Sequence, residues 1–187
     1  MNTGTAVLSE KEERELHNLQ FGVRRSIRYH NRRRRFFDGF DRLVKVLSVI
    51  GGSAAVVAVT ARYPNVGMAF AALVAVLSAL SLVVAPAQAA RLYEELARKF
   101  ANLEYKMKCA KDPNADQLNE FQAERLLIEA DEPPPMRVLD IICHNELCEA
   151  MGEDDCEFYE VGLLQSLFAQ VFDLWPSRIL KRVSRRE

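Results

Sequence analysis

Two long apolar segments, separated by only four residues, constrain this chain more than any other feature of its sequence. The first covers residues 43–61, with Lys45 as its only charged side chain, and the second covers residues 66–85, with none. At about 1.5 Å per residue, a helix of either length is about 30 Å long, which matches the hydrocarbon core of a bilayer. We therefore predict that both segments cross a membrane as α-helices.

The alternative is that the two segments are core helices of a soluble bundle. A core helix usually keeps one polar stripe, but Ser78 and Ser81 are the only polar side chains in the second segment. A serine hydroxyl can bond to its own helix backbone, so it is tolerated in lipid. The rest of the 187-residue chain is also too short and too charged to cover both helices on all sides.

The short connection forces the two helices into an antiparallel hairpin, with Pro64 and Asn65 expected to form the turn. Arg62 is the only cation between the segments, whereas many cations lie outside them: Arg24, Arg25, Arg28, Arg32, Arg33, Arg34, Arg35, Arg42 and Lys45 before the hairpin, and Arg91, Arg98 and Lys99 after it. By the positive-inside rule, both termini are predicted to be cytoplasmic.

Small residues are concentrated in the predicted hairpin, namely Gly51, Gly52 and Ala55 in the first helix and Ala71, Ala75 and Ala79 in the second. In lipid, small residues let helix backbones approach closely. This packing would seal the hairpin or join hairpins of several subunits, and we predict a homo-oligomer. No acidic or amide side chain lies in mid-membrane, so the sequence does not support a dedicated ion pathway.

Residues 1–42 are predicted to form a cytoplasmic, amphipathic and basic helix. Its four consecutive arginines, Arg32, Arg33, Arg34 and Arg35, cannot share one helix face. We interpret them as a basic collar at the membrane surface, which binds anionic headgroups at about 1 kcal/mol per residue. Nucleic-acid binding is the rival interpretation. It is disfavoured because the arginines adjoin a membrane span, so no nucleic-acid partner is expected.

Residues 87–111 are predicted to form a cytoplasmic exit helix. Its apolar residues recur at helical spacing and define a seam: Leu92, Leu96, Phe100, Leu103 and Met107. The seam could pack on the apolar stripe of residues 16–27 in the same chain, or it could form a subunit interface. Both alternatives stay open, and they do not exclude each other.

Residues 112–187 are predicted to form an acidic helical region with a basic tail. A short helix after Asn114 carries Leu118, Phe121, Leu126 and Leu127 on or near one face, and a second covers residues 136–151 and stops at Gly152. A last helix is expected near residues 157–175. The predicted fold class is therefore all-α, a transmembrane hairpin with long cytoplasmic helical extensions and a C-terminal helical subdomain.

The only candidate metal cluster consists of Cys143, His144, Cys148 and Cys156. Zinc needs its ligands around one point, but neighbouring Cys143 and His144 face different sides of a helix, and no C-x-x-C spacing is present. We predict no metal, no cofactor and no catalytic residues, hence no enzyme. In a cytoplasmic region the thiols, Cys109 included, should be reduced. The segment CHNEL (143–147) has no assigned role.

The segments RSIRYHNRRRRFF (25–37) and QAARLYEELARKFANLEYKM (88–107), on either side of the hairpin, resemble the SLATT family over residues 16–107. SLATT proteins are two-transmembrane effectors of bacterial conflict systems. The resemblance implies a protein of the bacterial inner membrane that oligomerises and opens a pore in antiviral defence. No sensor domain is appended here, so the trigger would come from a separate cytoplasmic sensor protein or from the acidic tail.

The stretch IEADEPPPMRVLDIICHNEL (128–147) resembles a bacterial or prophage family signature to which no chemistry is attached. A second function is compatible with the same sequence. The hairpin could serve as a non-lytic membrane anchor or scaffold, whose acidic C-terminal helices recruit a cytoplasmic partner.

Overall fold

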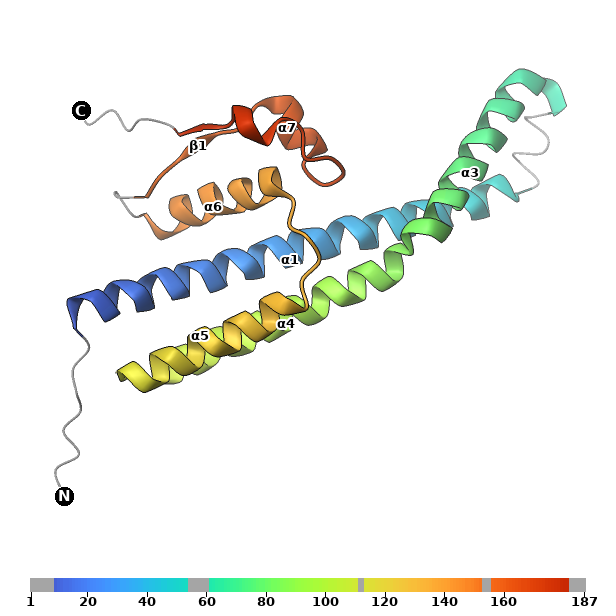
Figure 1. Ribbon diagram of the computed structural model, residues 1–187. Coiled ribbons are helices and arrows are strands. Elements are labelled where there is room, and N and C mark those ends of the chain that lie inside the picture. Colours follow the sequence, from blue (N-terminus) through green and yellow to red (C-terminus); the bar gives the residue numbers. More distant parts are fainter. Residues whose placement is uncertain (1–8, 54–60, 111–112, 153–155, 182–187) are drawn as a thin grey trace. The chain divides into compact units, whose positions relative to one another are not determined.

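The structure is a computed structural model that describes residues 9–53, 61–110, 113–152 and 156–181 (Figure 1). These residues are mostly helical, which confirms the predicted all-α class. The α-helices are α1 (Glu10–Gly51), α3 (Pro64–Val84), α4 (Pro86–Cys109), α5 (Ala115–Ala130), α6 (Arg137–Met151) and α7 (Leu163–Phe168). A 3-10 turn, η1 (Pro176–Arg178), and an antiparallel ribbon of β1 (Tyr159–Glu160) and β2 (Leu180–Lys181) complete the described elements.

The chain divides into two compact units. The first, here called the bundle unit, comprises residues 1–31 and 94–187 and contains α5, α6 and α7 together with the outer parts of α1 and α4. The second, the apolar unit, comprises residues 32–93 and contains α3, the later part of α1 and the first two turns of α4.

The bundle unit has a core in which four residues of the predicted α4 seam are almost completely buried: Leu96, Phe100, Leu103 and Met107. The spacing of these residues by three or four positions places them on one face of α4. Other buried side chains come from α1 (Leu19, Val23), α5 (Leu118, Phe121, Ile128) and α6 (Val138, Leu139, Cys143, Leu147). Packing within one chain, one of the two alternatives for the seam, therefore accounts for these four residues.

A side-chain cap marks the start of α5, and a glycine marks the end of α6. Asn114 accepts a hydrogen bond from the Gln117 backbone N–H at 2.8 Å, and the Gln117 side chain accepts one from the Asn114 N–H at 3.1 Å, so α5 starts with a capping box. Helix α6 ends, as predicted, at Gly152, whose φ of +65° suits a residue without a Cβ.

In the apolar unit, α1 approaches α3 at a glycine. A Cβ added to Gly51 would lie 3.3 Å from the Phe70 ring, so a larger residue there would push against α3. Helix α3 ends at Ala85, which adopts the left-handed conformation (φ +45°), and α4 begins at Pro86. Proline disfavours the α-conformation in the residue before it, which explains the break between the two helices.

Several local predictions were wrong. The last helix covers Leu163–Phe168 rather than residues 157–175, because a strand precedes it and an irregular segment follows it. Pro64 and Asn65 belong to the first turn of α3, not to a loop, since proline fits the first helical position. On α5, Leu126 and Leu127 are exposed, whereas Ile128 is buried in their place. Ala55 and most of the predicted span 54–61 lie outside the described residues.

The core assignment can be tested with two leucine truncations in the bundle unit. Leu103 is 0% exposed and Leu127 is 73% exposed. We expect Leu103→Ala to lower the free energy of unfolding by about 2–5 kcal/mol through cavity formation, and Leu127→Ala to change it by less than about 0.5 kcal/mol. Unfolding in detergent can be followed by the fluorescence of Trp175, the single tryptophan. Equal losses for the two variants would contradict the assignment.

Candidate functional site

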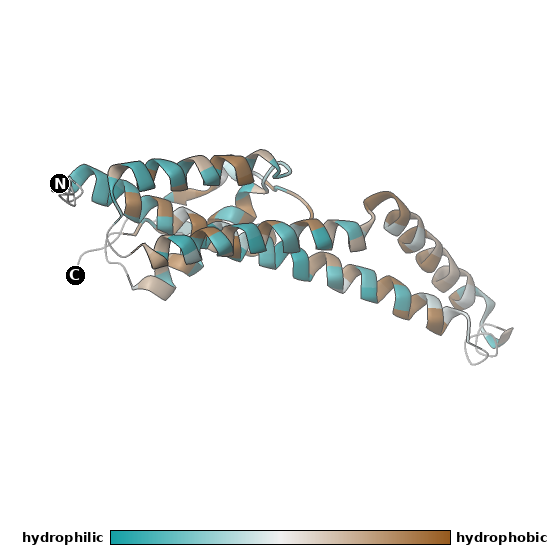
Figure 2. Cartoon of the chain, turned by 90° about the horizontal axis from the view of Figure 1, so that it is seen from below, coloured by the Kyte–Doolittle hydropathy of each residue, from teal (hydrophilic) through white to brown (hydrophobic). Residues whose placement is uncertain are grey.

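Helix α3 presents apolar side chains to its surroundings along its whole length. Gly67 is the one buried residue of this 21-residue helix, and all its other residues are partly or fully exposed. Figure 2 shows the contrast between α3, which is predominantly hydrophobic, and the mixed surfaces of α1 and α4. Among the described residues, α3 is the single helix that is long and apolar enough to cross a membrane.

The small residues of the predicted hairpin have different surroundings. Gly51, Gly52, Ala71 and Ala75 line one groove, together with Gly67, which the sequence analysis did not single out. Ala71, Ala75 and Ala79 are all exposed at four-residue spacing, so this face of α3 remains accessible to another helix. Gly51 of α1 lies against Phe70 of α3, so the two helices approach each other closely at this glycine.

The four arginines of the predicted collar do not share one environment. Arg35 is exposed, and Arg32 and Arg34 are partly buried, but Arg33 is only 6% exposed. The Arg33 guanidinium carbon lies 4.7 Å from the ring centroid of Phe37 and 5.1 Å from that of Tyr93, and these two rings stack at 5.6 Å. Arg33 is therefore an aromatic-packed residue that links α1 to α4 within the apolar unit.

The seam residue Leu92 differs from its four buried neighbours, since it is 41% exposed. Beside the buried part of the seam lies His30, whose ring stacks on Phe100 at 5.4 Å. The His30 Nε2 atom is 3.0 Å from a carboxylate oxygen of Glu132, just before the three prolines that lead to α6. Close by along α1, the Tyr29 hydroxyl accepts a hydrogen bond from the Met136 N–H at 2.9 Å. These two side chains fix the α5–α6 connection onto α1.

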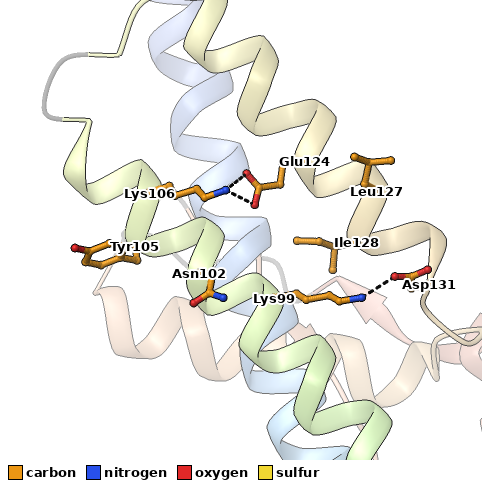
Figure 3. Close-up of a pocket in the computed structure, with 8 residues that line it drawn as sticks. All are labelled: Lys99, Asn102, Tyr105, Lys106, Glu124, Leu127, Ile128 and Asp131. Carbon is orange, nitrogen blue, oxygen red and sulfur yellow. Dashed lines mark hydrogen bonds and ion pairs between the residues drawn. The ribbon is translucent and has the colours of Figure 1, made fainter.

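A pocket of about 480 Å³ lies between α4 and α5 (Figure 3). Lys106 bonds to both carboxylate oxygens of Glu124 at 2.8 Å, and Lys99 bonds to Asp131 at the same distance. Ile128, between these pairs, is buried. Both lysines are already neutralised by carboxylates. The two ion pairs therefore join α4 to α5, and they leave no unpaired lysine among the described residues of the pocket to select a charged ligand.

Two carboxylates at the contacts of α1 have shifted pKa values. Burial raises the pKa of Asp140, although Arg25, 3.2 Å away, acts in the opposite direction. For Glu104, burial also opposes ionisation, but hydrogen bonds from Lys108 and Arg24 outweigh it and lower the pKa. Asp140 and Glu104 both lie at contacts between helices, which explains the two pKa shifts. Among the described residues, neither carboxylate faces a pocket that contains a second reactive group.

The CHNEL segment holds the C-terminal part of the chain against α6. Cys143 and Leu147 are buried in the core. Asn145 forms two hydrogen bonds with the backbone of Tyr159, at 2.7 and 3.0 Å, and His144 Nε2 lies 2.8 Å from the Glu157 carbonyl oxygen. Sequence spacing could not reveal this role, because the partners lie 13 or 14 positions apart and have no periodic signal.

The structure joins Cys148 to Cys156 in a disulfide, whereas the sequence analysis expects reduced thiols if this region is cytoplasmic. Cys109, which is exposed, and Cys143, which is buried, are not disulfide-bonded. His144 lies four residues before Cys148 on the same helix face, a pairing that the sequence analysis overlooked, and its Nε2 atom is 3.5 Å from the Cys148 sulfur. Reduction of the bridge would leave three donors within 4.8 Å of one another, one fewer than a closed zinc site uses.

No protein-family model matches this chain, and no curated protein or solved structure is significantly similar to it.

The role of Arg33 can be tested by changing single arginines to lysine. Lysine keeps the charge but loses the planar group that stacks on Phe37 and Tyr93. We expect Arg33→Lys to destabilise the protein by about 1 kcal/mol, whereas Arg35→Lys, at an exposed position of the same helix, should have no measurable effect. Thermal denaturation followed by circular dichroism measures both. Equal melting temperatures for Arg33→Lys and the unchanged protein would disprove the stacking role.

Proposed function

We propose that this protein is a multi-pass protein of the bacterial inner membrane, in which α3 and the preceding apolar segment 43–61 cross the bilayer as a hairpin. Both termini would be cytoplasmic. The chain would self-associate through the hairpin and act as a membrane-perturbing or pore-forming effector in a defence system. The observation that carries this proposal is that α3 buries none of its large apolar side chains and only Gly67 among its residues.

The physical argument begins with the solvent that α3 requires. Large side chains such as Leu82 and Val83 are more than four-fifths exposed, and large apolar residues at the end of α1, such as Val49, are exposed as well. Each buried aliphatic side chain is worth about 1.5–3 kcal/mol relative to water. Lipid chains supply that burial without any protein cover, and the helix backbone satisfies its own hydrogen bonds.

Self-association is supported by the accessible face of Ala71, Ala75 and Ala79. In lipid, helices associate through van der Waals packing of small residues rather than through the hydrophobic effect. A hairpin alone cannot enclose a pore, so membrane permeation by this chain requires several copies. The resemblance to the SLATT family supports the effector role and implies a separate cytoplasmic sensor as the trigger.

One observation favours the second candidate, a non-lytic anchor or scaffold. Four of the five seam residues on α4 are buried within a single chain, so they offer little surface for a cytoplasmic subunit interface. If the hairpin also does not oligomerise, the acidic helices would be left to recruit a partner. Induced expression in bacteria with a membrane-potential dye separates the two candidates, because only the effector depolarises the cells.

We expect Ala75→Leu to abolish both depolarisation and oligomer formation, because the larger side chain separates the helices that pack on this face. Ala69→Leu is the matched control. It makes the same change at an exposed position of α3 that lies away from the Ala71–Ala75–Ala79 face. Depolarisation is read from the dye, and the oligomer from light scattering in detergent.

Alkaline extraction of the same membranes tests insertion separately. The unchanged protein, the Ala75→Leu variant and the Ala69→Leu variant should all stay in the membrane pellet. Release into the supernatant would contradict the membrane-spanning hairpin. Retention without depolarisation by the unchanged protein would contradict the effector and support the anchor.

The cysteines test the predicted orientation. Disulfides are rare in a reducing cytoplasm, so a cytoplasmic α6 should carry Cys148 and Cys156 as free thiols in living cells. Their positions are nevertheless set for a bridge, and we expect the oxidant diamide to close it within one chain. Acid quenching followed by alkylation and mass spectrometry measures both states, with Cys148→Ser as the control. A bridge already present in untreated cells would place α6 outside the cytoplasm.

A further inference from the structure

The C-terminal segment around α7 presents apolar side chains on its outer face. Its six central residues are between 40% and 72% exposed: Leu164, Leu167, Phe168, Val171, Phe172 and Trp175. We call them the C-terminal apolar patch. Soluble proteins rarely expose so many large apolar side chains together, and such a patch commonly marks a surface that contacts a membrane or a partner.

Two polar side chains of the same segment, Gln165 and Asp173, form hydrogen bonds within the protein. Gln165 donates hydrogen bonds to the carbonyl oxygens of Leu174 and Trp175, at 3.0 and 3.1 Å. The Asp173 carboxylate accepts hydrogen bonds from the backbone N–H groups of Arg137 and Val138, at 3.1 and 2.8 Å, and thereby caps α6. The segment is thus tied down on its polar side, which leaves its apolar side outward.

Backbone geometry at the end of the patch supports this arrangement. Trp175 has a φ of +42°, a left-handed conformation that costs a residue with a Cβ about 1 kcal/mol or more. The two hydrogen bonds from Gln165 and the proline at position 176 hold this conformation in place. The indole ring is therefore presented on a defined turn that closes back toward α7.

Charge indicates which surface the patch would meet. The chain that follows carries five cations against one carboxylate, namely Arg178, Lys181, Arg182, Arg185 and Arg186 against Glu187. Lys181 already pairs with Glu157. Carboxylates of Glu146, Glu149 and Glu160 line a separate groove next to Leu163 and Ser166, at the beginning of α7. In the sequence, the cations follow Trp175 at the end of the patch, whereas the acidic groups line a groove beside its start.

We propose that the C-terminal apolar patch lies in the interfacial layer of an anionic bilayer, with the basic tail on the lipid headgroups. A six-residue helix is too short to span a membrane. Large apolar residues beside a cluster of cations are typical of segments that lie in the plane of the interface. Tryptophan and phenylalanine suit this layer, since an indole combines an apolar ring with an N–H donor.

This inference rests on the proposed membrane location only in that α3 would keep the patch near a bilayer. Different measurements test the two proposals, so either one can fail without the other. Alkaline extraction reports whether α3 is inserted, and Trp175 reports where the patch lies, because it is the only tryptophan in the chain.

The experiment uses the full-length protein in nanodiscs of phosphatidylcholine, with or without phosphatidylglycerol. We expect phospholipids brominated near the top of their acyl chains to quench Trp175 fluorescence, and the emission to shift to shorter wavelength, when phosphatidylglycerol is present. In phosphatidylcholine alone, or at high salt, quenching should fall, because each cation near an anionic surface contributes about a fivefold gain in binding.

Two variants and one control define the contacts. Leu167→Asp should abolish the quenching, since a carboxylate would have to enter the apolar layer. The double variant Arg182→Glu with Arg185→Glu should also reduce the quenching, because it should weaken binding to the anionic lipid by well over the fivefold expected for one cation. Leu127→Asp makes the same kind of change on the exposed face of α5 and should leave the quenching unchanged.

Three results would overturn the proposal. The first is an unquenched Trp175 in nanodiscs that contain phosphatidylglycerol, in a sample whose α3 resists alkaline extraction. The second is equal quenching in the two lipid compositions, which would remove the role of the anionic headgroup. The third is a blue shift that depends on protein concentration in detergent without lipid, which would assign the patch to contact with a second copy of the chain.

Discussion

The structure depends on one constraint, which is that the described residues leave most of the apolar surface of α3 uncovered. An apolar helix of this length exposed to water would lose the burial that stabilises helices, because the tertiary packing of an apolar face supplies most of that stability. The polar contacts between elements lie outside α3: the ion pairs between α4 and α5, the caps of α5 and α6, and the hydrogen bonds of the CHNEL segment. This separation explains why side chains pack differently in the apolar unit and in the bundle unit. In the bundle, large side chains such as Phe100 fill a core, whereas in the apolar unit α1 and α3 meet at Gly51.

The elements with a strong local signal could be predicted from the sequence. The α4 seam, the stop at Gly152 and the helical character of residues 66–84 all follow from periodicity, a glycine cap or continuous apolar composition, and the structure contains them. The error at residues 157–175 has a physical cause. Leu163, Leu164, Leu167, Phe168 and Val171 recur at helical spacing, but α7 stops at Phe168, where Gln165 turns back to bond the carbonyl groups of Leu174 and Trp175. A side chain that closes a turn over nine or ten residues leaves no periodic signal.

Residues that act through distant partners could not be predicted for the same reason. Arg33 belongs to a run of four arginines that look equivalent in sequence, yet it alone is classed as buried, because the stacked rings of Phe37 and Tyr93 lie beside it. Asp173 caps a helix that begins 36 residues earlier in the chain. His30 reaches Glu132 across 102 residues. In each case the residue type was visible, but its role is set by helix packing, which brings together segments far apart in sequence.

The positions of the charges connect the two membrane proposals to the fold. Transfer of a cation to the bilayer centre costs several kcal/mol. If the charge-free stretch 66–85 lies in the bilayer core, the cations on either side of it must therefore stay at the headgroups. Arg33 shows that a cation near the apolar unit need not contact lipid, because aromatic rings can accept it instead. Other cations before α3 pair with carboxylates, as Arg24 does with Glu104 and Arg25 with Asp140. Under the two membrane proposals, anionic headgroups would be the counter-charge for the exposed Arg35 and for the basic sequence after Trp175.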